Sequence, residues 1–263
     1  MRRGGVALLI PWRTLAGVTA EPGQVSRIGP VTAEVARALA TIAVNEADCE
    51  WRLIITGRAG SALAVTTIRK SWLEPNRPHA GAAGEQLRRG RQGVIARVVL
   101  TLPLAALDEA KAPGQTADGQ AAWPPKMQPV LAAALRAASR TAERARAASR
   151  LAAVGTSSGG ACQHEDAAPG YRVPDSMRAL LEARDRTCRH PGCRCPAWRS
   201  DQDHTIPYEH GGPTCPCNLS AECRRHHRLK QLSNWLLSQP RPGVLTWRTP
   251  AGLAYTVNPE PYG

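Results

Sequence analysis

The chain has 263 residues, and 34 lysines and arginines against 21 acidic residues give a formal net charge of +13 at pH 7. This length allows one or two domains with a sizeable core, and no apolar run approaches the roughly 20 residues that cross a bilayer, which excludes a transmembrane helix. The charge favours a polyanionic partner, but the excess of arginine over lysine and the absence of Phe are also typical of GC-rich genomes, so codon bias accounts for part of it.

The first residues, MRRGGVALLIPW, carry two arginines and a short apolar run. That run is shorter than the roughly 7–15 residues of a secretory signal core, and no small-residue cleavage site follows it. We therefore expect a cytoplasmic protein with no membrane partner, and the sequence leaves the oligomeric state open. In a reducing compartment the eight cysteines are better suited to metal binding than to disulfides.

Residues 1–70 are predicted to form a small α+β region. Val6–Ile10 is typical of a strand, Thr32 of a helix N-cap, and Trp51–Thr56 of a half-buried strand. The apolar residues of the intervening helix follow at near-helical spacing: Val35, Leu39 and Ile42. The region is predicted to be a small scaffold.

Residues 71–170 are predicted to be an insert and linker. Val94–Leu104 is a strong strand candidate that echoes Val6–Leu15, which allows an internal duplication. Met127–Ala153 is rich in alanine and arginine and predicts a helix with one basic side, either tracking phosphates or simply facing solvent. Loops are expected at Pro75–Arg91 and from Ala112 to Pro125. Gly155–Gly170 has linker composition, and no metal role is expected for its Cys162 and His164.

Most residues that could bind a metal lie in the segment from Arg184 to Lys230. This segment holds six of the eight cysteines and five of the seven histidines. A C-x4-C pair is followed about thirty residues later by a C-x2-H pair. The four residues are Cys188, Cys193, Cys223 and His226. Four N/S donors in a tetrahedron are what a closed structural Zn²⁺ site requires, so we predict one here.

A second set of polar residues is interleaved with the first: Asp203, His204, Asn218 and His227. Ser220–Leu232 predicts a helix capped by Asn218 or Ser220. Successive helical residues diverge by roughly 100°, so His226 and His227 face different directions. Two adjacent imidazoles therefore favour two metal sites, one structural and one catalytic.

These residues resemble the HNH endonuclease motif in D-H-x-x-P at Asp203–Pro207, N-L at Asn218–Leu219 and C-x-x-H-H at Cys223–His227. CRHPGC, HGGPT and CRRHHRLK are similar to the HNH domain of the actinobacterial 13E12-repeat proteins, which carry a DUF222 region upstream. This likeness covers about a quarter of the chain. IGPVTAEVARALA and WRLIITGRAG are similar to the end of the DUF222 region, which implies a member truncated on its N-terminal side.

The fold that we expect for residues 171–263 is a ββα-metal, treble-clef finger. A helix from Pro174 carries Met177, Leu180 and Leu181 behind the zinc knuckle. A hairpin with Asp203–His204, a Gly-rich loop and the helix with the two histidines follow. A hairpin of Gly243–Trp247 and Leu253–Val257 closes the domain. The whole chain is thus predicted as α+β.

Phosphodiester hydrolysis requires a base near neutral pH and a cation for the developing charge, which suits His204 as the general base. Asp203 and His227 are the expected ligands of a catalytic Mg²⁺ or Mn²⁺. The resemblance implies that Asn218 either orients His204 or completes the metal shell. Because strand neighbours leave on opposite faces, Asp203 and His204 require a bulge, a twist or a backbone carbonyl to cooperate.

Four cations of the predicted helix are expected to contact DNA phosphates: Arg224, Arg225, Arg228 and Lys230. The expected partner is double-stranded DNA, read with weak sequence preference. A catalytically inactive zinc-finger module that binds nucleic acid, and a structural zinc domain, remain alternatives. The extra cysteines Cys195, Cys215 and Cys217, and Ser200 where relatives often have Cys, leave open whether Cys217 displaces a predicted ligand.

Overall fold

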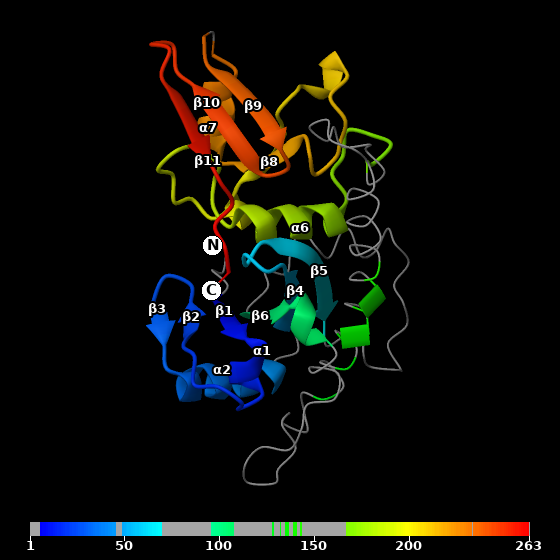
Figure 1. Ribbon diagram of the computed structural model, residues 1–263, viewed down its shortest axis with the longest axis vertical. Coiled ribbons are helices and arrows are strands. Elements are labelled where there is room, and N and C mark those ends of the chain that lie inside the picture. Colours follow the sequence, from blue (N-terminus) through cyan, green and yellow to red (C-terminus); the bar gives the residue numbers. More distant parts are fainter. Residues whose placement is uncertain are drawn as a thin grey trace. The chain divides into compact units, whose positions relative to one another are not determined.

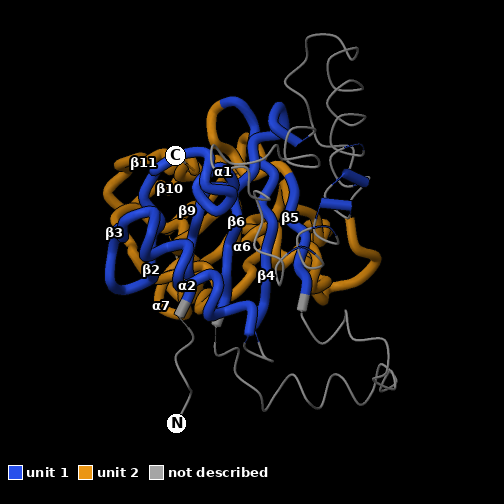
Figure 2. The backbone as a smooth tube through the Cα atoms, turned by 90° about the horizontal axis from the view of Figure 1, so that it is seen from below, with its two compact units in different colours: residues 1–58, 64–144 blue, residues 59–63, 145–263 orange. Residues whose placement is uncertain are grey.

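A computed structural model describes residues 6–45, 49–69, 96–107, 167–232 and 234–262, with seven further residues from 128 to 143 (Figure 1). The chain divides into two compact units, one of residues 1–58 and 64–144 and one of residues 59–63 and 145–263 (Figure 2). The loops expected at Pro75–Arg91 and Ala112–Pro125, as well as Cys162 and His164, lie outside the described residues. Within the described part of the chain, no helix is long and apolar enough to cross a membrane.

The first unit is built on a six-stranded sheet with the strand order β3-β2-β1-β6-β4-β5. Its elements are β1 (Val6–Pro11), α1 (Trp12–Leu15), β2 (Gly23–Val25), β3 (Gly29–Val31), α2 (Ala33–Asn45), β4 (Cys49–Thr56), β5 (Ala62–Arg69), β6 (Ala96–Pro103) and the short 3₁₀ helix η2 (Leu104–Ala106). The seven described residues of the alanine-rich segment are helical, and Arg136 and Arg140 among them are exposed.

Strand β6 lies between β1 and β4 and runs parallel to both. Leu8, Val98 and Trp51 therefore form one row across the three strands, and a second row lies two residues further along each strand. That second row is Ile10, Leu100 and Leu53. The predicted insert thus contributes a strand to the middle of this sheet, while the boundaries 1–70, 71–170 and 171–263 stay predictions.

The two strands that echo each other in sequence end in the same way. Pro11 is the last residue of β1 and caps α1 with a φ of −62°, and Pro103 is the last residue of β6 and caps η2 with a φ of −58°. Proline fixes φ near this value and lacks the N–H that a helix start leaves unpaired, so both strands turn directly into a helix. The parallel neighbours β1 and β6 thus share the same transition from a strand through a proline into a short helix.

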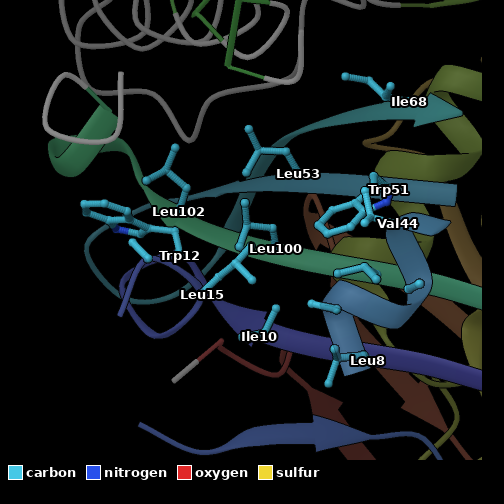
Figure 3. Close-up of a cluster of buried hydrophobic side chains, with 14 of the residues drawn as sticks. Leu8, Ile10, Trp12, Leu15, Val44, Trp51, Leu53, Ile68, Leu100 and Leu102 are labelled. Carbon is cyan, nitrogen blue, oxygen red and sulfur yellow. The ribbon is translucent and has the colours of Figure 1, made fainter. Parts of the chain in front are cut away.

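The core of this unit gathers the inward side chains of β1, β6 and β4 with Trp12 and Leu15 (Figure 3). Helix α2 begins after Thr32 as predicted and buries Ala33, Ala36, Ala40 and Ala43, whereas Val35, Leu39 and Ile42 are exposed. A Cβ on Gly23 would lie 2.7 Å from Ala36 Cβ, so only small side chains fit beneath the helix. Strand β4 is also buried almost throughout, which corrects the half-buried strand expected at Trp51–Thr56.

The second unit has two small sheets, β7-β8 and β11-β10-β9. Its elements are α6 (Asp175–Asp185), η4 (Ala197–Arg199), β7 (Asp201–His204), η5 (Tyr208–His210), β8 (Leu219–Glu222), α7 (Arg224–Lys230), β9 (Leu236–Arg241), β10 (Val244–Arg248) and β11 (Ala254–Val257). Helix α6 follows Pro174 and packs Met177 and Leu181 against Leu219 of β8. Strands β10 and β11 form the predicted closing hairpin, and β9, not predicted, extends it to three strands.

The helix expected over Ser220–Leu232 is shorter than predicted. Residues 219–222 form β8, which pairs with β7 in a regular antiparallel register, and the helix starts only after Cys223. Cys223 has an extended backbone and precedes the first helical turn, so neither Asn218 nor Ser220 caps it. Ser220 and Glu222 are fully buried, so burial within the hairpin outweighs their local preference for a helix start.

A buried charge network joins the segments around the cysteine-rich stretch. The Asp185 carboxylate is fully buried, binds Arg184 Nε at 2.7 Å and accepts the Ala221 N–H at 2.8 Å. Arg184 also donates to the Leu219 carbonyl, and Arg189 donates to the carbonyls of Gly243 and Val257. Two arginines that contribute to the net charge are therefore structural, and neither is available to a polyanion.

Candidate functional site

The first half of the cysteine cluster sits on a tight turn. Cys193 N–H donates to the His190 carbonyl at 3.1 Å, and Gly192 has a φ of +72°. A type II turn prefers Pro at its second position and requires a positive φ, hence Gly, at its third. Pro191–Gly192 supplies both, so the turn brings the thiols of Cys188 and Cys193 to the same side.

The four predicted zinc ligands come together. The thiol sulfurs of Cys188, Cys193 and Cys223 and a ring nitrogen of His226 lie within 4.8 Å of one another. His226 Nδ1 is 3.4 Å from Cys188 Sγ and 3.3 Å from Cys223 Sγ. Zinc bonds of about 2.0–2.3 Å in a tetrahedron place neighbouring donors about 3.5 Å apart, so this donor set could hold a structural Zn²⁺.

The ionisation of these groups suits metal binding. Burial, with His190 and Arg225 nearby, lowers the pKa of His226 to about 4, which keeps the imidazole neutral. Burial raises the pKa of Cys223, but the N–H groups of His226 and Arg225 and the neighbouring thiols outweigh it, and the net pKa is lowered. Burial and the Glu222 carboxylate raise the pKa of Cys188, whose proton a bound metal would displace.

The ring of His190 stacks on His226 with 3.8 Å between the ring centroids. His190 also meets Trp247, which is fully buried and donates its indole N–H to the Arg189 carbonyl at 2.9 Å. The orientation of the ligand His226 is therefore fixed by packing against the three-stranded sheet. Among the described residues, the Cys3His cluster does not include Cys195, Cys215 or Cys217.

A second polar cluster surrounds His227, which leaves α7 in a different direction from His226. His227 Nε2 is 3.3 Å from Asp203 Oδ1, and its Nδ1 is 2.9 Å from Asp201 Oδ2. Lys230 Nζ lies 2.6 Å from Asp203 Oδ2 and also donates to the backbone carbonyl of His204. The structure thus brings Asp203 and His227 within reach of one cation, and it places adjacent histidines in two separate clusters.

His204 lies on the other face of β7. The hairpin register is regular, so no bulge reverses the alternation of Asp203 and His204. The His204 side chain is buried, and its Nε2 lies 2.9 Å from Thr214 Oγ1. Tyr171 stacks on its ring at 5.3 Å and Tyr208 meets it edge-on. Burial and Lys230 lower its pKa while Asp203 opposes them, so the imidazole is neutral at neutral pH.

Asn218 clamps the loop between β7 and β8. Its Oδ1 accepts the Ile206 N–H at 2.9 Å, and its Nδ2 donates to the carbonyls of Ile206 and Pro213 at 3.0 Å each. Gly212 passes so close that a Cβ there would lie 1.9 Å from the Ile206 carbonyl oxygen. Both the oxygen and the nitrogen of the Asn218 amide bond to the loop backbone. Asn218 therefore positions the chain that follows His204 and does not contact the His204 ring.

The four predicted phosphate-binding cations differ in their surroundings. Arg225 and Arg228 are exposed. Arg224 is exposed too, and its NH1 lies 3.3 Å from Asp201 Oδ2. The Lys230 side chain is 12% exposed and points inward, towards Asp203. Lys230 therefore belongs to the polar cluster and not to the outer rim of the helix.

Sequence reasoning missed three residues that line these clusters: Asp201, Thr214 and Tyr171. Asp201 could have been found, because residues i and i+2 of a strand share a face and Asp203 was already singled out. Thr214 and Tyr171 meet His204 only through tertiary contacts, from a loop and from the segment before α6. No local pattern marks those two positions.

Comparisons with known proteins give partial similarity. The chain is 42% identical over 93 residues to Uncharacterized protein Rv3776 of Mycobacterium tuberculosis, a match that covers 35% of this chain and 18% of that protein. Uncharacterized protein Rv2100 of the same organism is 42% identical over 94 residues, covering 35% and 17%. Uncharacterized protein Rv1945 is 32% identical over 78 residues, covering 30% and 17%.

The matched segment is therefore less than a fifth of the length of these relatives. No protein-family model matches the chain, and no solved structure matches it significantly. The comparisons and the structure together show a mixed α+β protein, related in part to these mycobacterial proteins, with a C-terminal Cys3His cluster consistent with a zinc-binding module.

Proposed function

We propose that this chain is a metal-dependent HNH endonuclease that hydrolyses DNA phosphodiester bonds. The observation that carries the proposal is that two adjacent histidines face two different clusters. His226 faces the three cysteines, while His227 faces Asp203 at 3.3 Å. A purely structural finger uses the first cluster and has no use for the second. The succession of β7, β8 and α7 around these clusters supports a ββα-metal, treble-clef arrangement.

Asp203 and His227 would hold the catalytic Mg²⁺ or Mn²⁺. A carboxylate oxygen and a neutral imidazole nitrogen are ligands that such cations accept, and the donor spacing of 3.3 Å fits one shared ion. When bound, the cation supplies charge neutralisation at the phosphate and at the departing oxygen. Lys230, already paired with Asp203, adds a second positive charge at the same place.

His204 would accept the proton of the attacking water. Thr214 has one hydroxyl proton and lies 3.5 Å from the Tyr171 carbonyl, to which it donates. It can then accept from His204 Nε2–H, which leaves the lone pair on Nδ1. The lowered pKa of His204 keeps that nitrogen unprotonated. β7 ends at His204, so a phosphate bound at the strand end would lie next to both Asp203 and His204.

A zinc-finger module that binds nucleic acid without cutting it is the second candidate. One observation favours it: the His204 side chain is 5% exposed, beneath Tyr171 and Tyr208. Catalysis requires that DNA binding displaces at least one of these tyrosines. Tyr171 is 66% exposed, so its displacement costs little buried surface.

Nicking of supercoiled plasmid by the purified zinc-loaded chain tests the proposal. Open-circular DNA should accumulate with added Mg²⁺ or Mn²⁺, and EDTA at a concentration that leaves the bound zinc in place should stop it. Zinc content is measured in the same samples. DNA binding without nicking in either metal would reject the nuclease and leave the binding module.

The exposed arginines of α7 give a second prediction. If Arg225 and Arg228 contact phosphates, each alanine replacement should reduce the slope of log affinity against log salt by about one unit. Fluorescence anisotropy with a labelled duplex measures this slope. Arg58→Ala, which changes an exposed arginine of the other unit, is the control. Slopes that match wild type in both variants would attribute this charge to codon bias.

A further inference from the structure

The second polar cluster holds a carboxylate that no step above uses. Asp201 lies two residues before Asp203 on β7, so the two side chains leave the strand on the same face. Its Oδ2 is 2.9 Å from His227 Nδ1, while Asp203 Oδ1 is 3.3 Å from His227 Nε2. One imidazole is thus held between two carboxylates.

The two ring nitrogens of a histidine cannot both bind one cation. If Nε2 shares a metal with Asp203, Nδ1 must carry the proton and needs an acceptor. Asp201 provides that acceptor at hydrogen-bond distance. Such a carboxylate fixes the tautomer and the ring orientation of the ligand and makes the ligand nitrogen more basic.

Arg224 offers a competing explanation for Asp201. Its NH1 lies 3.3 Å from the same Oδ2, so Asp201 could serve only to anchor this arginine. The two contacts differ in burial, because the Arg224 side chain is 68% exposed and the His227 side chain 21%. An exposed ion pair contributes little, whereas a hydrogen bond to a largely buried imidazole restricts a ligand.

We infer that Asp201 is the positioning residue of the catalytic metal site: it accepts Nδ1–H from His227 and so presents Nε2 to a divalent cation shared with Asp203. The inference rests on the proposed function for the identity of that site. It assigns Asp201 a role towards the metal and not towards DNA.

Mn²⁺ binding to the full zinc-loaded chain, measured by electron paramagnetic resonance titration, tests this inference. Asp201→Ala should weaken Mn²⁺ binding about 10- to 100-fold, the usual effect of losing such a partner, with unchanged zinc content. Arg224→Ala should bind Mn²⁺ at least as tightly as wild type. Glu209→Ala, which removes an exposed carboxylate outside the cluster, controls for net charge.

Equal Mn²⁺ affinity of Asp201→Ala and wild type would overturn the inference, and so would an equal loss in Arg224→Ala. If Asp201→Ala loses zinc, the isosteric Asp201→Asn takes its place. It should weaken binding by a smaller factor, and an unchanged affinity would again count against the inference. A wild type whose Mn²⁺ affinity depends on Asp201 but that does not nick plasmid would reject the nuclease alone.

Discussion

Replacing His204 with alanine is expected to lower the rate of plasmid nicking by about 10²–10⁴, the usual contribution of a positioned general base. His204 belongs neither to the Cys3His cluster nor to the exposed arginines of α7, so zinc content and DNA affinity should stay at wild-type values. Asp203, His227 and Lys230 face the other side of β7 and keep their contacts. Single-turnover nicking at saturating Mg²⁺ measures the effect.

His210→Ala is the control, because His210 is an exposed histidine of the loop that follows His204. It should nick like wild type. His227→Ala should instead weaken the exchangeable metal, so that a higher Mg²⁺ or Mn²⁺ concentration restores part of the rate, whereas no concentration rescues His204→Ala. Nicking by His204→Ala at the wild-type rate would remove this histidine from the mechanism.

Replacing Cys223 with serine should release the structural zinc and unfold the second unit. Zinc binding to small finger domains is worth about 10–16 kcal/mol at neutral pH, which is as large as the about 5–15 kcal/mol of total stability of a typical domain. Cys223 also precedes α7 directly, so its loss disturbs the helix that carries both histidines. Metal analysis measures the loss of zinc, and limited proteolysis within residues 167–262 measures the unfolding.

Cys217→Ser is the control for this experiment, since Cys217 lies outside the four-residue cluster. It should keep one zinc and resist proteolysis like wild type. His226→Ala should behave like Cys223→Ser and not like His227→Ala, although the two histidines are neighbours. Full zinc content in both Cys223→Ser and His226→Ala would show that other residues bind the metal.

The zinc cluster was predictable because its information is local. The spacings Cys188-x4-Cys193 and Cys223-x2-His226 each describe a turn whose geometry is set within a few residues, and Pro191–Gly192 names the turn type. The divergence of His226 and His227 follows from helix geometry alone. The structure places all these side chains as the local rules require.

Other features depend on partners distant in the chain. Ser220 has the chemistry of a helix cap, yet pairing with Asp203 across the hairpin makes it part of a strand. Similarly, Val98 occupies the middle of a sheet whose other strands come before residue 70, which no pattern around it indicates. In α2, Val35 and Leu39 follow an ordinary amphipathic spacing, but the close approach of Gly23 selects the alanine side of the helix.

Helix α7 starts directly after Cys223, and this position restricts insertions and deletions in the segment. Only two residues separate Cys223 from His226, and His227 follows at once. One added residue would rotate both histidines by roughly 100° around the helix axis, turning each away from its own cluster. The two residues between Cys223 and His226 can be substituted, but none can be added or removed. Sequence change in this segment is therefore confined to substitutions.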